Sequence, residues 1–239
     1  MTKVDAIEHV MIENGGSASL QYIYDNIEKF YPSAKVSKNW SAGIRGVLYR
    51  ELTYGSRFKK IGLSIYALSN YQEEKIKKTN KVRRHSLMEG MCIELGNSQN
   101  FNTFTADPSA LYRDNTFLNN IATISDLPLF TYKDIIHQAK LIDVLWFNKS
   151  IHSFPQYAFE IVDSISTLNG AINRCMQLHN FRTKFFIVAP EEHHTKFEQT
   201  MDLAIYRQQK ELFTFLSYHT IQDTYERLVE DNESLKWLH

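Results

Sequence analysis

The spacing of apolar residues in the second half of the chain predicts a mixed core of strands and helices. Residues 141–146 and 158–163 are apolar segments of strand length, and they carry the carboxylates Asp143 and Glu160. A helical pattern follows at 168–178, and a third apolar strand is predicted at 184–189. We also expect helices at 85–96, 133–139, 191–201 and 221–230, and a late strand at 213–216. Such a mixture is typical of an α/β core with a central mixed sheet.

The first third of the chain has a different pattern. Apolar residues at helical spacing predict helices at 4–14, 20–30 and 40–52, with Gly15 and Gly16 ending the first. Ser17 and Ser19 can cap the second helix. Two short strands at 58–61 and 64–68, joined at Gly62, follow the third helix. Three helices and a β-hairpin are the order of a winged helix-turn-helix, so the predicted fold is mixed α+β.

These patterns divide the chain into three predicted parts. Residues 1–70 form the winged-helix domain, residues 71–84 a charged linker, and residues 85–239 the α/β domain. The chain has 27 basic and 27 acidic residues, but residues 1–84 hold 15 of the basic ones and only 8 of the acidic ones. This asymmetry favours a polyanion as the partner of the first part, although the charged linker contributes much of it.

Other features of the composition limit the location and the partners. Cys92 and Cys175 form neither a disulfide framework nor a zinc signature, which is typical of a reducing compartment. No apolar run approaches the roughly 18–20 residues that cross a bilayer. We therefore expect a cytoplasmic protein with no membrane partner and no small-molecule substrate.

The predicted DNA-reading surface is the third helix and the turn before it. In a helix-turn-helix, the second helix of the motif enters the major groove with its amino end. Hydrogen-bond donors gather there, and further basic residues lie on the predicted hairpin, where contacts with phosphates are expected. The expected DNA-binding residues are Lys38 and Asn39 in the turn, Ser41 and Arg45 on the helix, and Arg57, Lys59 and Lys60 on the hairpin.

This first part resembles the HARE-type winged helix-turn-helix found at the start of some bacterial restriction endonucleases. The resemblance covers about a third of the chain and rests largely on core positions. The matching residues are 4–7, the helix 22–24 that ends at Tyr31-Pro32, the helix 44–48 and the hairpin strand 65–68.

The second part resembles the PD-(D/E)XK nuclease fold. Members of this fold place an Asp on one strand and, on the next strand, a three-residue motif of Asp or Glu, any residue, and Lys. Asp143 and Glu160 fit the two acids, and Glu89 lies on the preceding helix, where some members carry another acidic ligand. The resemblance implies that Asp143, Glu160 and Glu89 bind Mg²⁺ or Mn²⁺. Arg174, on the helix after the second strand, either contacts a DNA phosphate or pairs with an acid such as Glu160.

The chain departs from this pattern at Val162, which occupies the position of the family's Lys. The positive charge could come from Lys184 or, as a second choice, from Lys140. Alternatively, a metal-only mechanism could use Asp163 or Glu89, or the domain could bind DNA without cutting it. Strand alternation points Asp163 away from the face that Glu160 shares with Val162, so we expect Asp163 to cap the next helix.

Together these patterns predict a type II restriction-type endonuclease that hydrolyses the backbone of double-stranded DNA with a divalent metal ion. Two cuts in a duplex favour a homodimer. The alternatives are a modification-dependent endonuclease and a non-catalytic DNA-binding regulator with a nuclease-like dimerisation domain. The catalytic interpretation assumes that Asp143 and Glu160 converge, because a cation offsets the cost of burying paired carboxylates.

Overall fold

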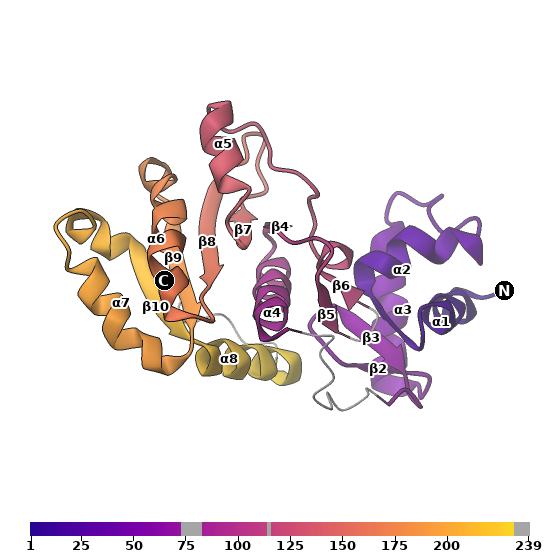
Figure 1. Cartoon of the computed structure of the whole chain (residues 1–239). Helices are drawn as coiled ribbons and strands as arrows, with labels where there is room; N and C mark the ends of the chain where they lie inside the picture. The colour runs from indigo at the N-terminus through magenta and orange to yellow at the C-terminus, as the bar shows by residue number, and fades with distance from the viewer. Residues whose placement is uncertain (73–82, 114–115, 232–239) are drawn as a thin grey trace.

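A computed structural model describes residues 1–72, 83–113 and 116–231 of the chain (Figure 1). The predicted charged linker at 71–84 falls mostly on residues outside these ranges. The fold is mixed α+β and contains a five-stranded sheet flanked by helices, as the apolar pattern indicates. Among the described residues, no helix combines the length and the apolar character needed to cross a membrane.

The N-terminal part consists of three helices and a small antiparallel sheet. The helices are α1 (Lys3–Glu13), α2 (Leu20–Asn26) and α3 (Trp40–Tyr54), and the strands are β1 (Ser17–Ser19), β2 (Phe58–Lys60) and β3 (Ile65–Leu68). Strand β3 lies between β1 and β2. The side chain of Ser19 accepts a hydrogen bond from the backbone N–H of Tyr22 and so caps α2, as expected.

The large sheet has the strand order β10-β9-β8-β7-β4. Strands β8, β9 and β10 run parallel, whereas β7 is antiparallel to both β8 and β4. The bounds of the strands are β4 (Asn102–Thr105), β7 (Val144–Phe147), β8 (Pro155–Ile161), β9 (Lys184–Ala189) and β10 (Phe213–Ser217). The strand predicted at 184–189 has these same bounds, and the other predicted strands differ by a few residues at their ends.

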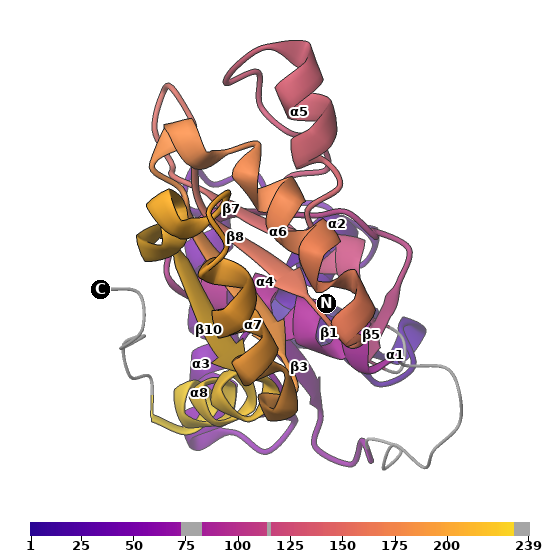
Figure 2. The ribbon, with the colours of Figure 1, turned by 60° about the vertical axis from the view of Figure 1, so that its left-hand side comes forward.

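Two apolar cores cover the two faces of this sheet. Helices α4 (Arg84–Ser98) and α8 (Tyr218–Asp231) pack on the face that carries Val144, Phe159 and Ile161. Helices α5 (Lys133–Ala139), α6 (Leu168–Met176) and α7 (His194–Met201) cover the opposite face (Figure 2). Because side chains alternate along a strand, adjacent residues on β8 belong to different cores. This division decides which polar groups can meet.

A tight packing contact fixes α4 against the sheet. The indole N–H of Trp146 on β7 donates a hydrogen bond to the backbone carbonyl of Cys92 at 3.1 Å. A Cβ atom at Gly96 would lie only 2.6 Å from the Trp146 ring, so α4 can approach this closely only with glycine at that position. The contact holds the second half of α4 against β7, and the candidate site lies at the amino end of the same helix, beside the start of β7.

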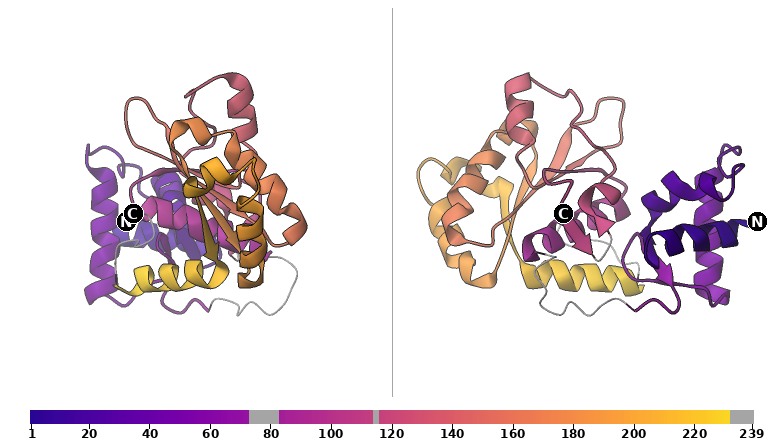
Figure 3. Two further views of the ribbon diagram at one scale, coloured as in Figure 1. Left: turned by 90° about the vertical axis from the view of Figure 1, so that its left-hand side faces the viewer. Right: turned by 45° about the vertical axis from the view of Figure 1, so that its right-hand side comes forward.

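The N-terminal part lies at one end of the molecule (Figure 3), and a buried carboxylate joins it to the rest. Glu94 on α4 is fully buried and accepts hydrogen bonds from the N–H of Ser64 at 2.6 Å and its hydroxyl at 2.5 Å. Its other oxygen accepts hydrogen bonds from the hydroxyls of Tyr112 on β5 (Leu111–Arg113) and Tyr225 on α8. Ser64 lies in the turn between β2 and β3, so this hairpin is anchored on the helix of the larger unit.

Three short strands were not predicted from the sequence. Strand β1 is three residues long and was interpreted only as a capping segment. The pair β5 and β6 (Thr116–Phe117) follows a stretch without clear periodicity. All three strands are too short for an alternating pattern to stand out. Strand β1 is held by pairing with the distant strand β3, whereas β5 and β6 pair with each other.

The Glu94 contacts generate a prediction about stability. Replacing Glu94 by Ala removes the carboxylate that accepts hydrogen bonds from Ser64, Tyr112 and Tyr225. The buried donors of these residues then lose their acceptor. We expect the free energy of unfolding to fall by about 2–4 kcal/mol, as for other broken buried networks. Urea unfolding measures this loss, and Glu211→Ala, at an exposed position, is the matched control. Equal stability of the two variants would contradict the proposed anchoring role of Glu94.

Candidate active site

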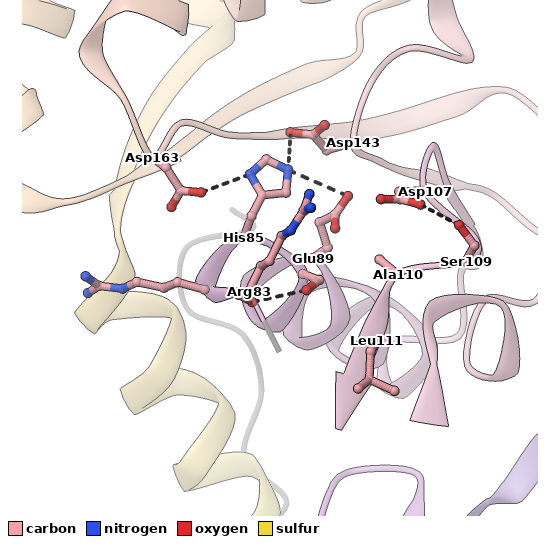
Figure 4. A pocket seen from close by; sticks show the side chains of 11 residues that line it. Arg83, His85, Glu89, Asp107, Ser109, Ala110, Leu111, Asp143 and Asp163 are labelled. Carbon is pink, nitrogen blue, oxygen red and sulfur yellow. Dashed lines mark hydrogen bonds and ion pairs between the residues drawn. The ribbon is translucent and has the colours of Figure 1, made fainter. Parts of the chain in front are cut away.

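The candidate site is a pocket at the amino end of α4, beside the start of β7 and the end of β8 (Figure 4). It has a volume of about 940 Å³ and is lined mainly by charged groups. The lining residues that concern the chemistry are Arg83, His85, Glu89, Asp107, Asp143 and Asp163. Four carboxylates therefore face one pocket, and basic side chains stand between them.

His85 occupies the centre of this arrangement. Its Nε2 atom lies 3.6 Å from a carboxylate oxygen of Asp143 and 3.8 Å from one of Glu89. Its Nδ1 atom lies 3.3 Å from a carboxylate oxygen of Asp163. The hydroxyl of Tyr218 on α8 donates a hydrogen bond of 2.5 Å to Asp163 and holds that carboxylate in place. The imidazole is thus surrounded by acids from three parts of the fold.

The crowding of acids changes the pKa values of the groups in the pocket. Burial and then the charge of Asp143 raise the pKa of Glu89 to about 8, although His85 opposes the rise. Burial by itself would lower the pKa of His85, but the hydrogen bond and charge of Asp143, with Glu89 and Asp163, raise it to about 9. A protonated His85 therefore offsets part of the negative charge when only protein groups are present.

The burial of Glu89 indicates room for another cation. Its side chain is 2% exposed, and among the described residues its Oε2 atom has no hydrogen-bond partner. Glu89, Asp143 and His85 each offer a ligand atom, and these three atoms lie within 4.8 Å of one another. A buried carboxylate oxygen without a partner is costly unless it binds a proton or a cation. The donor set therefore fits a divalent metal ion.

The backbone fixes the position of Asp143. One carboxylate oxygen accepts a hydrogen bond of 2.7 Å from the N–H of Ile161, at the end of the neighbouring strand β8. The register pairs Val144 with Phe159, so Asp143 and Glu160 are the next residues opposite each other. Their proximity in register was predicted. Glu160, however, shares the face of Ala158 and Val162, which is covered by α6, whereas Glu89 comes from the helix on the other face.

Glu160 forms an ion pair instead of joining this group. Both of its carboxylate oxygens accept hydrogen bonds from the guanidinium of Arg174 on α6, at 2.7 and 2.5 Å. The carboxylate is completely buried. Burial raises the pKa of Glu160, and the hydrogen bonds from Arg174 oppose that rise. Of the two roles considered for Arg174, the geometry agrees with the pairing to an acid.

The other residues considered for the missing positive charge lie elsewhere. Lys184 begins β9 opposite Tyr157, three residues before Glu160 along the parallel pair, and therefore roughly 10 Å away along the strand. Lys140 forms an ion pair with Asp126 at 2.6 Å. The expectation that Asp163 caps a helix is wrong, because its carboxylate contacts His85 and Tyr218. Strand alternation did place it correctly, on the face opposite to Glu160.

The predicted DNA-binding residues fall into two groups. On and before α3, Lys38, Asn39 and Arg45 are exposed, and Ser41 is half-buried. The basic residues of the hairpin are mostly engaged within the chain. Arg57 forms ion pairs with Asp5 at 2.9 Å and Glu8 at 3.0 Å. Lys59 donates a hydrogen bond to the backbone carbonyl of Tyr71, and burial lowers the pKa of Lys60.

His85 is the residue whose central position the sequence analysis missed. The signal available was its spacing of four residues from Glu89, which puts both side chains on one face of a helix. His85 is the first residue of the helix predicted at 85–96, and no metal-binding role was expected for it. Helix α4 begins at Arg84, so its first turn already carries the imidazole.

Comparison with known proteins assigns the chain to the restriction endonucleases. The family model that matches is described as the Type II restriction enzyme NmeDI C-terminal domain, and it matches residues 66–236. Because this range is more than half of the chain, the chain belongs to that family. Membership implies a nuclease with DNA as its substrate. The searches of curated proteins and of solved structures found no match.

The ion pair between Glu160 and Arg174 generates a second prediction. Arg174→Met leaves the buried Glu160 carboxylate without its partner, and we expect a loss of roughly 3 kcal/mol in the free energy of unfolding. The double variant Glu160→Gln with Arg174→Met should recover part of the loss, because no buried charge remains. Denaturant unfolding of the two single variants, Arg174→Met and Glu160→Gln, and of the double variant tests this coupling, and losses that simply add would argue against a structural pair.

Proposed function

We propose that this protein is a type II restriction-type endonuclease that hydrolyses phosphodiester bonds of duplex DNA with a divalent metal ion. The family match supports the nuclease class. Metal-dependent chemistry is supported by the grouping of Glu89, Asp143 and His85 in one pocket. One buried carboxylate oxygen of Glu89 also has no hydrogen-bond partner among the described residues. The nuclease fold of PD-(D/E)XK type remains part of this proposal.

The carboxylates of Asp143 and Glu89 are the oxygen donors for the ion, and His85 can add a nitrogen once it loses its proton. Mg²⁺ prefers oxygen ligands, whereas Mn²⁺ also accepts imidazole, so both ions suit the set. When bound, a divalent ion lowers the pKa of water and offsets the negative charge of the phosphate. Glu160, which we expected to be a metal ligand, lies opposite Asp143 in the strand register. Both of its carboxylate oxygens, however, accept hydrogen bonds from Arg174.

The side chains around these ligands hold them in position. The N–H of Ile161 orients Asp143, and the Tyr218 hydroxyl orients Asp163. His85 bridges the acids of α4, β7 and β8, so a change in its charge affects all of them. These contacts pre-position the donors, and such preorganisation lowers the barrier for phosphoryl chemistry.

We propose that the N-terminal part is a winged helix of the HARE type that reads part of the DNA site. The order of its helices and hairpin supports this interpretation. The exposed groups Lys38, Asn39 and Arg45 make α3 the DNA-facing helix. The hairpin has a different role in this account, because its turn is anchored on Glu94 and Arg57 is paired with Asp5 and Glu8.

A homodimer is the simplest assembly for this activity. One copy of the pocket can cut one strand at a time, and a symmetric pair of copies would place two pockets on the two strands of a palindromic site.

Removal of one metal-binding carboxylate tests the site. Asp143→Asn and Glu89→Gln keep the shape of each side chain but weaken cation binding. We expect each variant to lose plasmid cutting in Mg²⁺ by at least about 100-fold, the scale of losing a key electrostatic group. Binding of DNA should persist in both variants, and chelation should stop the wild-type protein. Normal cutting by both variants would exclude this pocket as the active site.

Charge reversal on α3 and on the turn before it tests the proposed DNA-reading surface. Lys38→Glu and Arg45→Glu should weaken DNA binding and reduce the slope of log affinity against log salt by about one for each lost phosphate contact. Fluorescence anisotropy over a salt series measures both quantities. Lys196→Glu, on the exposed side of α7, is the control for a change in net charge. If the α3 variants behave like this control, DNA binds to another surface.

A further inference from the structure

We propose that Arg83 contacts the phosphate that is cleaved and supplies the positive charge that the chain lacks at Val162. This inference rests on the proposed function and assigns a substrate-binding catalytic role to a residue outside the strands. The sequence analysis looked for this charge on Lys184 and Lys140, and neither lies at the pocket.

The backbone of Arg83 is fixed while its side chain is available. Arg83 is the N-cap of α4, and its carbonyl accepts hydrogen bonds of 3.1 Å from the N–H of Leu87 and from the hydroxyl of Ser86. Its side chain lines the pocket and points into it beside His85 and Glu89 (Figure 4). Within the described part of the chain, no carboxylate lies in ion-pair contact with its guanidinium.

The other arginines near the pocket have different partners. The guanidinium of Arg84 lies over the ring of Tyr218, 4.6 Å from its centre, and so packs toward α8. Arg174 is held by Glu160 on the opposite face of the sheet. Arg84 is also exposed and also lines the pocket, but its guanidinium packs on Tyr218, whereas the guanidinium of Arg83 points into the pocket and has no carboxylate partner among the described residues.

The charge balance of the pocket gives Arg83 a chemical task. Glu89, Asp107, Asp143 and Asp163 would together repel a phosphate diester, even with one divalent ion present. A guanidinium presents paired N–H donors that match two phosphate oxygens, and the amino end of α4 adds a favourable dipole. During hydrolysis, water adds its oxygen to phosphorus, one P–O ester bond breaks, and the leaving oxygen takes up a proton. Negative charge grows on the oxygens that Arg83 can reach.

The test compares Arg83→Ala and Arg83→Lys with the wild-type protein in single-turnover cutting of a DNA that the wild type cuts. Because Arg83 acts on developing charge, we expect Arg83→Ala to lower the cutting rate at saturating protein about 100- to 1,000-fold. The affinity for DNA should fall much less. Arg83→Lys should retain an intermediate rate, and added guanidinium ions at low millimolar concentration should partly restore cutting by Arg83→Ala. Arg207→Ala, at an exposed position on another face, controls for the loss of one charge.

The outcomes separate this inference from the proposed function. If Arg83→Ala cuts at the wild-type rate while Asp143→Asn does not cut, the role of Arg83 is wrong and the metal site stands. If Asp143→Asn and Glu89→Gln also cut normally, both proposals are wrong. A loss of rate in Arg83→Ala that matches a loss of DNA affinity, without rescue by guanidinium, would overturn the catalytic role, because it would show a binding contact alone.

Discussion

The structure depends most on the crowding of carboxylates around the first turn of α4. Asp143, Asp163 and Glu89 come from different elements, yet all three reach His85 within 3.8 Å. Like charges brought this close repel one another, and burial adds to the cost. Such an arrangement needs a proton on one of the acids or positive charge among them, and His85 provides such a charge, which a divalent ion can provide in its place. The same requirement makes the pocket suitable for phosphate chemistry.

The large sheet creates this crowding by separating its two faces. Alternation along β8 sends Glu160 toward α6 and leaves Asp163, just beyond the strand, on the side of α4 and α8. Asp143 sits at the boundary, where the end of β8 donates an N–H to it. Two acidic centres result, one neutralised by Arg174 and one open to the pocket. The assignment to the restriction endonucleases does not depend on which acid binds metal, because it comes from the family match.

Much of this architecture could be predicted from sequence. The strand at 184–189 and the helix at 133–139 have strong periodicity and sharp ends, and both appear with the predicted bounds. The position of Asp143 beside the second strand and the opposite orientation of Asp163 also followed from the strand pattern and alternation, whereas Glu89 was proposed only from the resemblance to the nuclease fold. The role of Arg174 could only be narrowed to a contact with a DNA phosphate or a pairing with an acid such as Glu160, because a pairing across fourteen residues depends on how α6 packs. The place of His85 was missed because two of its three contacts, those with Asp143 and Asp163, are long-range, and local spacing indicates only the contact with Glu89.

Anomalous diffraction from crystals containing Mn²⁺ tests the central claim most directly. This account predicts one or more Mn²⁺ peaks in contact with the carboxylates of Asp143 and Glu89, with Glu160 still paired to Arg174. A peak bound between Asp143 and Glu160 with Arg174 displaced, or ordered Mn²⁺ only at a distance from this pocket, would contradict it.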